Sequence, residues 1–171
     1  MSSTHRVWKL VAQRFFRVND ASKLRRQRAT GSLLDYSPFQ GGWAGKAYNE
    51  HAFRHFLSIE RSRANQSACW FLLVLVSLKR PPGSDIDLAP SISAALFSGL
   101  GLCVREVDFV GWFREDRVAG AVLAQGKKPT VEVTRIVRKR ITEVLCNHLP
   151  LLLRQRLQVR VVQLGSRTTT G

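Results

Sequence analysis

The sequence has few acidic residues, few cysteines and no long apolar run. Asp and Glu number 12 against 27 Lys and Arg, so the net charge is +15. The three cysteines, Cys69, Cys103 and Cys146, are an odd set without a C-x-x-C spacing, so we expect free thiols in a reducing compartment. The longest uncharged apolar run, residues 67–78, is shorter than the roughly 20 residues of a membrane-spanning helix. We therefore predict a cytoplasmic protein.

Motifs of the common enzyme classes are also missing. The chain contains neither a G-x-S-x-G sequence nor a phosphate-binding loop. His51 and His55 have a spacing that can chelate a metal on a helix, but a solvated helix face is the favoured interpretation. Cys146 and His148 lie too close together at a helix end to act as nucleophile and base. The sequence therefore predicts no ordinary hydrolase or kinase, and no metal or cofactor is expected.

The excess positive charge is confined to the two ends of the chain. Residues 1–30 carry 8 basic and 1 acidic residue, residues 31–125 carry 9 of each, and residues 126–171 carry 10 basic and 2 acidic residues. This distribution predicts that the ends bind an acidic partner or an anionic surface, such as the inner face of a membrane. A basic nucleic-acid-binding protein is the alternative, although no recognised DNA- or RNA-binding motif is present.

With 171 residues and 44% hydrophobic content, the chain is long enough for one domain with a real core. Residues 1–46 are predicted to form a basic N-terminal arm and linker, in which residues 6–18 are either a basic amphipathic helix or a partly ordered tail. The Gly-, Ser- and Pro-containing stretch that follows has the composition of a linker. We expect the domain to span residues 47–166, with a tail at 167–171.

Hydrophobic periodicity within this domain predicts an α/β (α+β) sandwich, in which a mixed sheet with a β-hairpin is flanked by helices. Phe71, Leu73, Leu75, Val122 and Val161 are predicted to share its core. The expected helices are 48–63, 90–101 and 130–149, and the expected strands are 69–78, 104–113, 118–124 and 157–165.

Two short runs give a resemblance to a known family. Arg105-Glu106-Val107-Asp108, a five-residue spacer and then Arg114-Glu115-Asp116-Arg117 resemble the R-x-x-D motif and signature hairpin of the GGDEF (diguanylate cyclase) domain. The resemblance covers about residues 48–166 and implies a nucleotide-cyclase-like fold. Asn49 ahead of the first helix and the closing VVQLGS sequence agree with it.

The signature is degenerate. Arg114 and Glu115 stand where the family has two glycines that let the backbone approach the nucleotide. Asp116 matches the first acidic position, but Arg117 stands at the next one. The first strand has no carboxylate, although the family uses an aspartate there to hold magnesium. The resemblance therefore implies a catalytically inactive domain, with a residual enzyme that uses Glu115 and Asp116 on another nucleotide as a weaker alternative.

The resemblance also suggests a ligand and partners. The family's R-x-x-D is an inhibitory site for cyclic di-GMP, so Arg105 and Asp108, with Trp112, Arg114 and Asp116, are the candidate ligand-binding residues. A structural ion pair that orients the hairpin is the alternative. The run Glu60-Arg61-Ser62-Arg63 and the run from Arg105 to Trp112 resemble degenerate domains associated with sugar transferases in bacterial exopolysaccharide systems. This implies a regulatory or scaffolding role, with a sugar transferase or another exopolysaccharide protein as partner, and a homodimer is a further expectation.

Overall fold

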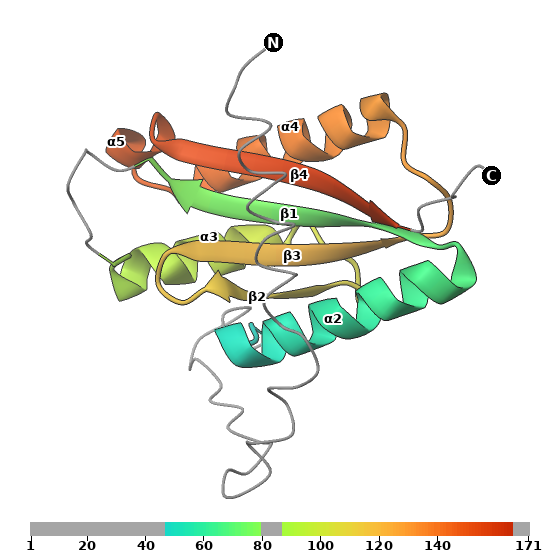
Figure 1. The fold of residues 1–171 in the computed structure, drawn as a ribbon. Coiled ribbons are helices and arrows are strands. Elements are labelled where there is room, and N and C mark those ends of the chain that lie inside the picture. Colours follow the sequence, from blue (N-terminus) through green and yellow to red (C-terminus); the bar gives the residue numbers. More distant parts are fainter. Residues whose placement is uncertain (1–46, 80–86, 166–171) are drawn as a thin grey trace, which may run out of the picture. The chain divides into compact units, whose positions relative to one another are not determined.

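The computed structural model describes residues 47–79 and 87–165, and Figure 1 shows their arrangement. Four strands form one sheet, and four helices accompany them. In chain order the elements are α2 (Glu50–Ser67), β1 (Trp70–Leu78), α3 (Pro90–Gly101), β2 (Phe109–Arg114), β3 (Val118–Gln125), α4 (Val131–His148), α5 (Leu151–Arg154) and β4 (Leu157–Gly165).

The strands lie side by side in the order β2-β3-β1-β4, and each of the three ladders is antiparallel. β3 therefore lies between β1 and β2, which α3 connects, and β1 lies between β3 and β4, which α4 connects. This is the β-α-β-β-α-β arrangement of two interleaved split units. Parallel pairing among the described residues is limited to a bridge between Tyr48 and Gly111, so the predicted mixed sheet is mixed only at that edge.

Local sequence signals explain where the longer helices begin. The Asn49 side chain accepts a hydrogen bond from the amide of Ala52 at 2.8 Å, and the Thr130 side chain accepts one from Val133 at 3.2 Å. Both are N-cap bonds that satisfy amides left without a partner at a helix start. Pro90 occupies the first turn of α3, where its missing amide costs nothing.

Helices cover both faces of the sheet. α2 lies on one face, and α3 and α4 lie on the other (Figure 1). β1 is apolar on both faces and nearly all of it is buried, which is why its sequence is a continuous apolar run instead of an alternating one. The two helical layers create two separate cores, because side chains alternate between the faces of a strand.

The predicted single core is corrected by this geometry. Phe71, Leu73, Leu75 and Val122 are buried on the α2 face. Val161 pairs with Val74 and belongs with the cluster under α3 and α4, on the opposite face. The five residues therefore divide between two cores. Phe71, Leu73 and Leu75 lie on one face of β1, whereas Val161 is in register with Val74, whose side chain lies on the other face.

The predicted α/β sandwich with a hairpin and flanking helices is confirmed, with adjusted ends. The first hairpin strand begins at Phe109 instead of residue 104, because residues 105–108 form a turn in which the Asp108 amide bonds to the Arg105 carbonyl at 3.0 Å. The face predicted for helix 130–149 is buried at Ile141 and Leu145 but exposed at Ile136, in its first half. α5 was not predicted, and the expected arm at residues 1–46 lies outside the described residues.

Candidate functional site

The turn between β2 and β3 contains the residues compared with the GGDEF signature in the sequence analysis. Its residues are Arg114 to Arg117, and the Arg117 amide bonds to the Arg114 carbonyl at 3.1 Å. Asp116 has a left-handed backbone, with φ of 51°. Asp tolerates this conformation better than most residues because its short polar side chain bonds locally. An aspartate at this point therefore has a backbone role in the hairpin.

The start of α2 holds one side of this hairpin tip. One carboxylate oxygen of Glu50 accepts a hydrogen bond from the Glu115 amide at 2.7 Å, and the other pairs with the Arg54 guanidinium at 2.8 Å. Arg54 also donates to the Phe113 carbonyl at 3.3 Å. The side chains of Glu50 and Arg54 thus form hydrogen bonds with backbone groups of the tip.

The segment before α3 holds the other side of the tip. The Arg117 guanidinium pairs with Asp87 at 3.0 Å, and the Leu88 amide donates to the Asp116 carbonyl at 2.7 Å. The tip is therefore fixed from two directions by bonds within the chain.

The Glu115 carboxyl lies close to two other carboxylates. Burial raises the pKa of the Glu115 carboxyl, and the neighbouring charges of Asp116 and Glu50 raise it further. Each of these effects disfavours the ionised form.

Close packing of α2 on the hairpin depends on two glycines. A Cβ on Gly111 would lie 2.6 Å from the Tyr48 carbonyl oxygen, and a Cβ on Gly120 would lie 2.7 Å from the Phe53 ring. The Tyr48 backbone lies in this space and bonds to β2 on either side of Gly111. The Tyr48 amide donates to the Val110 carbonyl, and the Tyr48 carbonyl accepts from the Trp112 amide. The approach that positions Glu50 and Arg54 therefore needs glycine at both places.

Arg105 and Asp108 form a compact clamp at the opposite end of the hairpin. One Asp108 oxygen accepts from the Arg105 amide at 2.9 Å and from its Nε at 3.2 Å, and the other accepts from Arg105 Nη2 at 3.3 Å and the Ala124 amide at 3.0 Å. Arg105 Nη2 also donates to the Ala124 carbonyl at 2.6 Å. The pair joins the turn before β2 to the end of β3.

The two members of the clamp differ in exposure. The Asp108 side chain is 2% exposed, whereas the Arg105 side chain is 63% exposed. The four hydrogen bonds use the accepting positions of the carboxylate, so Asp108 can accept from a ligand only by giving up a bond within the chain. Nη1 of the Arg105 guanidinium takes part in none of these bonds.

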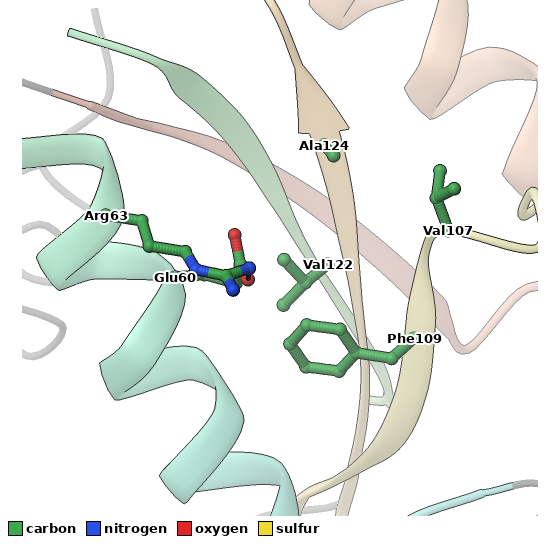
Figure 2. Close-up of a pocket in the computed structure, with 6 residues that line it drawn as sticks. All are labelled: Glu60, Arg63, Val107, Phe109, Val122 and Ala124. Atoms are coloured by element: carbon green, nitrogen blue, oxygen red, sulfur yellow. Dashed lines mark hydrogen bonds and ion pairs between the residues drawn. The ribbon is translucent and has the colours of Figure 1, made fainter. Parts of the chain in front are cut away.

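A shallow pocket lies beside the clamp, between α2 and the hairpin strands (Figure 2). Its volume is about 230 Å³. Glu60 and Arg63 of α2 pair at 2.9 Å and form its polar side. Its apolar side consists of Val107, Phe109, Val122 and Ala124. The pocket is smaller than the roughly 300–1,000 Å³ of most small-molecule sites, so a ligand the size of a dinucleotide would lie mainly on the surface.

The structure divides the candidate ligand-binding residues into three places. Arg105 and Asp108 lie just before β2. Arg114 is the last residue of β2 and Asp116 follows it. The rise per residue of a β-strand places the two pairs roughly 20 Å apart. Trp112 is 3% exposed and packs edge-on against Phe97 of α3, with ring centroids 4.8 Å apart. The five residues do not form one site.

Sequence reasoning did not identify Glu50 and Arg54 as contacts of the hairpin tip. The only available signal was their position at the start of a capped helix, where Glu50 is the first residue and Arg54 lies one turn later. This position does not indicate which strand the helix packs against. Within residues 47–79 and 87–165, no three His, Cys, Asp or Glu side chains are grouped as a metal site requires. No helix in these ranges is long and apolar enough to span a membrane.

Comparison with solved structures identifies the fold. The GGDEF domain of FimX from Pseudomonas aeruginosa matches with a TM-score of 0.55 and 21% identity, over 77% of this chain and 83% of that one. The chain has the fold of a GGDEF domain. A DGC protein from Thermotoga maritima matches with a TM-score of 0.50 and 16% identity, over 68% of this chain and 79% of that one. No family model matches the sequence, and no curated protein matches it.

Proposed function

We propose that this chain is a catalytically inactive GGDEF-like module with a regulatory or scaffolding role. The observation that carries the proposal is the hydrogen bonding of the hairpin tip to α2 of the same chain. The Glu115 amide is bonded to Glu50, and Arg114 and Glu115 place side chains where the family pattern has glycines. The tip therefore binds its own chain instead of a nucleotide.

Physical chemistry supports this proposal in two ways. A phosphate oxygen could use the Glu115 amide only by displacing the Glu50 carboxylate, which also pairs with Arg54. The charge of a triphosphate would also meet the carboxyl of Glu115, whose pKa is raised by burial and further by the neighbouring carboxylates of Asp116 and Glu50. β1, which is buried along most of its length, offers no carboxylate for a magnesium ion that could offset this repulsion.

The direct test is an activity assay. Purified protein is incubated with GTP and magnesium, and the nucleotides are separated by chromatography. We expect no cyclic di-GMP above the level of a sample without protein. Magnesium-dependent product that increases with protein concentration would contradict the proposal.

Binding of cyclic di-GMP beside the clamp is a second candidate function. The exposed Arg105 guanidinium and the pocket formed with Arg63 favour it, because planar guanidinium groups suit both phosphate and guanine. Calorimetric titration with cyclic di-GMP tests it. If the site binds, Arg63→Ala should weaken the binding, while Arg138→Ala on α4 should leave it unchanged. Absence of binding heat for the parent protein would leave the clamp with a structural role alone.

A role in bacterial exopolysaccharide production, with a sugar transferase as partner, is part of the proposal. Its support is the sequence resemblance of the two runs at Glu60–Arg63 and Arg105–Trp112, which meet at the pocket. Affinity capture of the full chain from a polysaccharide-producing bacterium should recover the transferase if the module acts on it. Recovery that is equal for a Glu60→Lys, Arg63→Glu variant would place the contact elsewhere.

A further inference from the structure

The two edges of the sheet differ in how they end. At the β2 edge, Tyr48 bonds to Val110 and Trp112, and the register shifts between Trp112 and Arg114. At the β4 edge, the ladder to β1 runs through nine residue pairs without a register shift. Among residues 47–79 and 87–165, no backbone pairs with the outer side of β4. β4 is thus a long, regular edge strand.

The hydrogen-bonding pattern shows which groups of β4 face outward. The Lys79 amide donates to the Arg156 carbonyl at 2.6 Å, so this pair, next in register after Leu78 and Leu157, is hydrogen-bonded. Bonded and non-bonded pairs alternate in an antiparallel ladder. The N–H and C=O groups that point away from β1 therefore belong to Leu157, Val159, Val161 and Gln163.

β4 has almost none of the features that keep edge strands from pairing. It contains no proline, and Arg160 is its one charged residue. Natural edges usually carry charges, prolines or bulges, because a bare edge is a template for another strand. The side chains of Val159 and Val161 pack partly against the core and leave the outward backbone groups beside an apolar surface.

Charge distinguishes between occupants of this edge. Residues 126–165, which include α4 and β4, carry nine Lys and Arg against two Glu, whereas the rest of the described chain is balanced. α4 packs on β4, and its exposed Arg138, one turn after the Thr134 that bonds to Gln163 of β4, has no carboxylate partner in the described ranges. A second copy of this chain would bring two such basic halves together. An acidic strand would instead neutralise them.

We infer that β4 binds an extended, acidic segment of another protein as a fifth strand of the sheet. The outward N–H and C=O groups of Val159 and Val161 would form the ladder, and acidic side chains at alternate positions would lie on the face of the sheet that α4 covers, beside its exposed basic side chain Arg138. This inference is independent of the proposed loss of catalysis.

The test uses the full chain and a fluorescein-labelled peptide of nine residues with alternating Val and Glu, matched to the length of β4. Val161→Pro removes one outward amide, and an edge strand tolerates proline where the amide faces away from its neighbour. Val161→Thr keeps the amide and is the matched control. We expect the proline variant to lose about tenfold or more in affinity by fluorescence anisotropy, and the threonine variant to stay within about twofold.

Three further measurements keep the test decisive even if the proline variant folds poorly. Arg138→Glu should weaken binding of the Val–Glu peptide, and a Val–Lys peptide should not bind the parent protein. Hydrogen exchange at Val159 and Val161 should slow when the Val–Glu peptide is added.

Four outcomes would overturn the inference. They are equal binding of the Lys peptide, equal binding by Val161→Pro, protection of both amides before the peptide is added, and a dimer of the parent chain that Val161→Pro makes monomeric. The third outcome would mean that another segment of the chain covers the edge, and the fourth that a second copy does.

Discussion

At the scale of single residues, Asp108 and Glu115 show how similar carboxylates are used differently. Asp108 is buried and accepts four hydrogen bonds from its own chain, so its charge is compensated where it lies. Glu115 is exposed, and its backbone amide, not its carboxylate, makes the contact with Glu50. The first residue stabilises the fold, whereas the charge of the second opposes it.

Replacing Asp108 with Ala should lower the free energy of unfolding by about 1–3 kcal/mol, because the amides of Arg105 and Ala124 would lose a buried acceptor. Arg105→Ala should cost less, about 0–1 kcal/mol, since that side chain is mostly exposed. Urea unfolding monitored by circular dichroism measures both. A ligand-binding role without a structural one would leave the midpoint of Asp108→Ala unchanged.

Glu115→Gln should stabilise the protein at neutral pH. The pKa of the Glu115 carboxyl is raised above its ordinary value of 4.5, so the folded state holds this proton more tightly than the unfolded state. The penalty on folding is therefore absent below about pH 4.5 and grows as the pH rises through the raised pKa. Thermal melts of variant and parent should coincide at the acidic end and diverge above it.

Glu106→Gln, in the exposed turn before β2, removes the same charge away from the hairpin tip and is the control. A stabilisation by this variant equal to that of Glu115→Gln would show that total charge, not the environment of the tip, is responsible.

At the scale of elements, the contact between α2 and the hairpin determines the geometry of the candidate site. The helix can approach β2 and β3 closely because Gly111 and Gly120 leave room for the Tyr48 backbone and the Phe53 ring. Glu50 and Arg54 reach the tip only as a consequence of this approach.

Gly111→Ala should destabilise the fold by about 1–3 kcal/mol, because the new methyl group would overlap the Tyr48 carbonyl. Gly126→Ala, where no atom lies within 4 Å of the added Cβ, is the matched control and should leave stability nearly unchanged. Chemical denaturation compares the two. Equal stability of both variants would mean that α2 does not pack on β2 as described.

The elements themselves could be predicted from sequence, because periodicity, N-caps and turn residues are local signals. α3 has the predicted ends, β1 begins one residue later than predicted and ends as predicted, and α4 is one residue shorter at each end. The assignment of Val161 to the wrong core arose because the register between β1 and β4 depends on the whole sheet. The contacts of Glu50 and Asp108 were missed or left open for the same reason, since their partners lie 65 and 16 residues away in the chain.

At the scale of the whole molecule, the charges of the described chain are unevenly distributed along the sequence. The hairpin, α2 and the clamp belong to residues 47–79 and 87–125, where acidic and basic residues are equal in number. Residues 126–165 carry the excess positive charge of the described chain, and α4 and β4 hold less than half of it. The described residues up to 125 therefore have no net positive charge to attract phosphates, whereas residues 126–165 do.

The central claim is that the hairpin tip is bound to its own chain and holds no nucleotide. Calorimetric titration of the full chain with GTP, in the presence and absence of magnesium, tests it most directly. The account predicts no saturable heat in either condition. Stoichiometric binding of GTP that requires magnesium, and that Glu50→Ala alters, would contradict it.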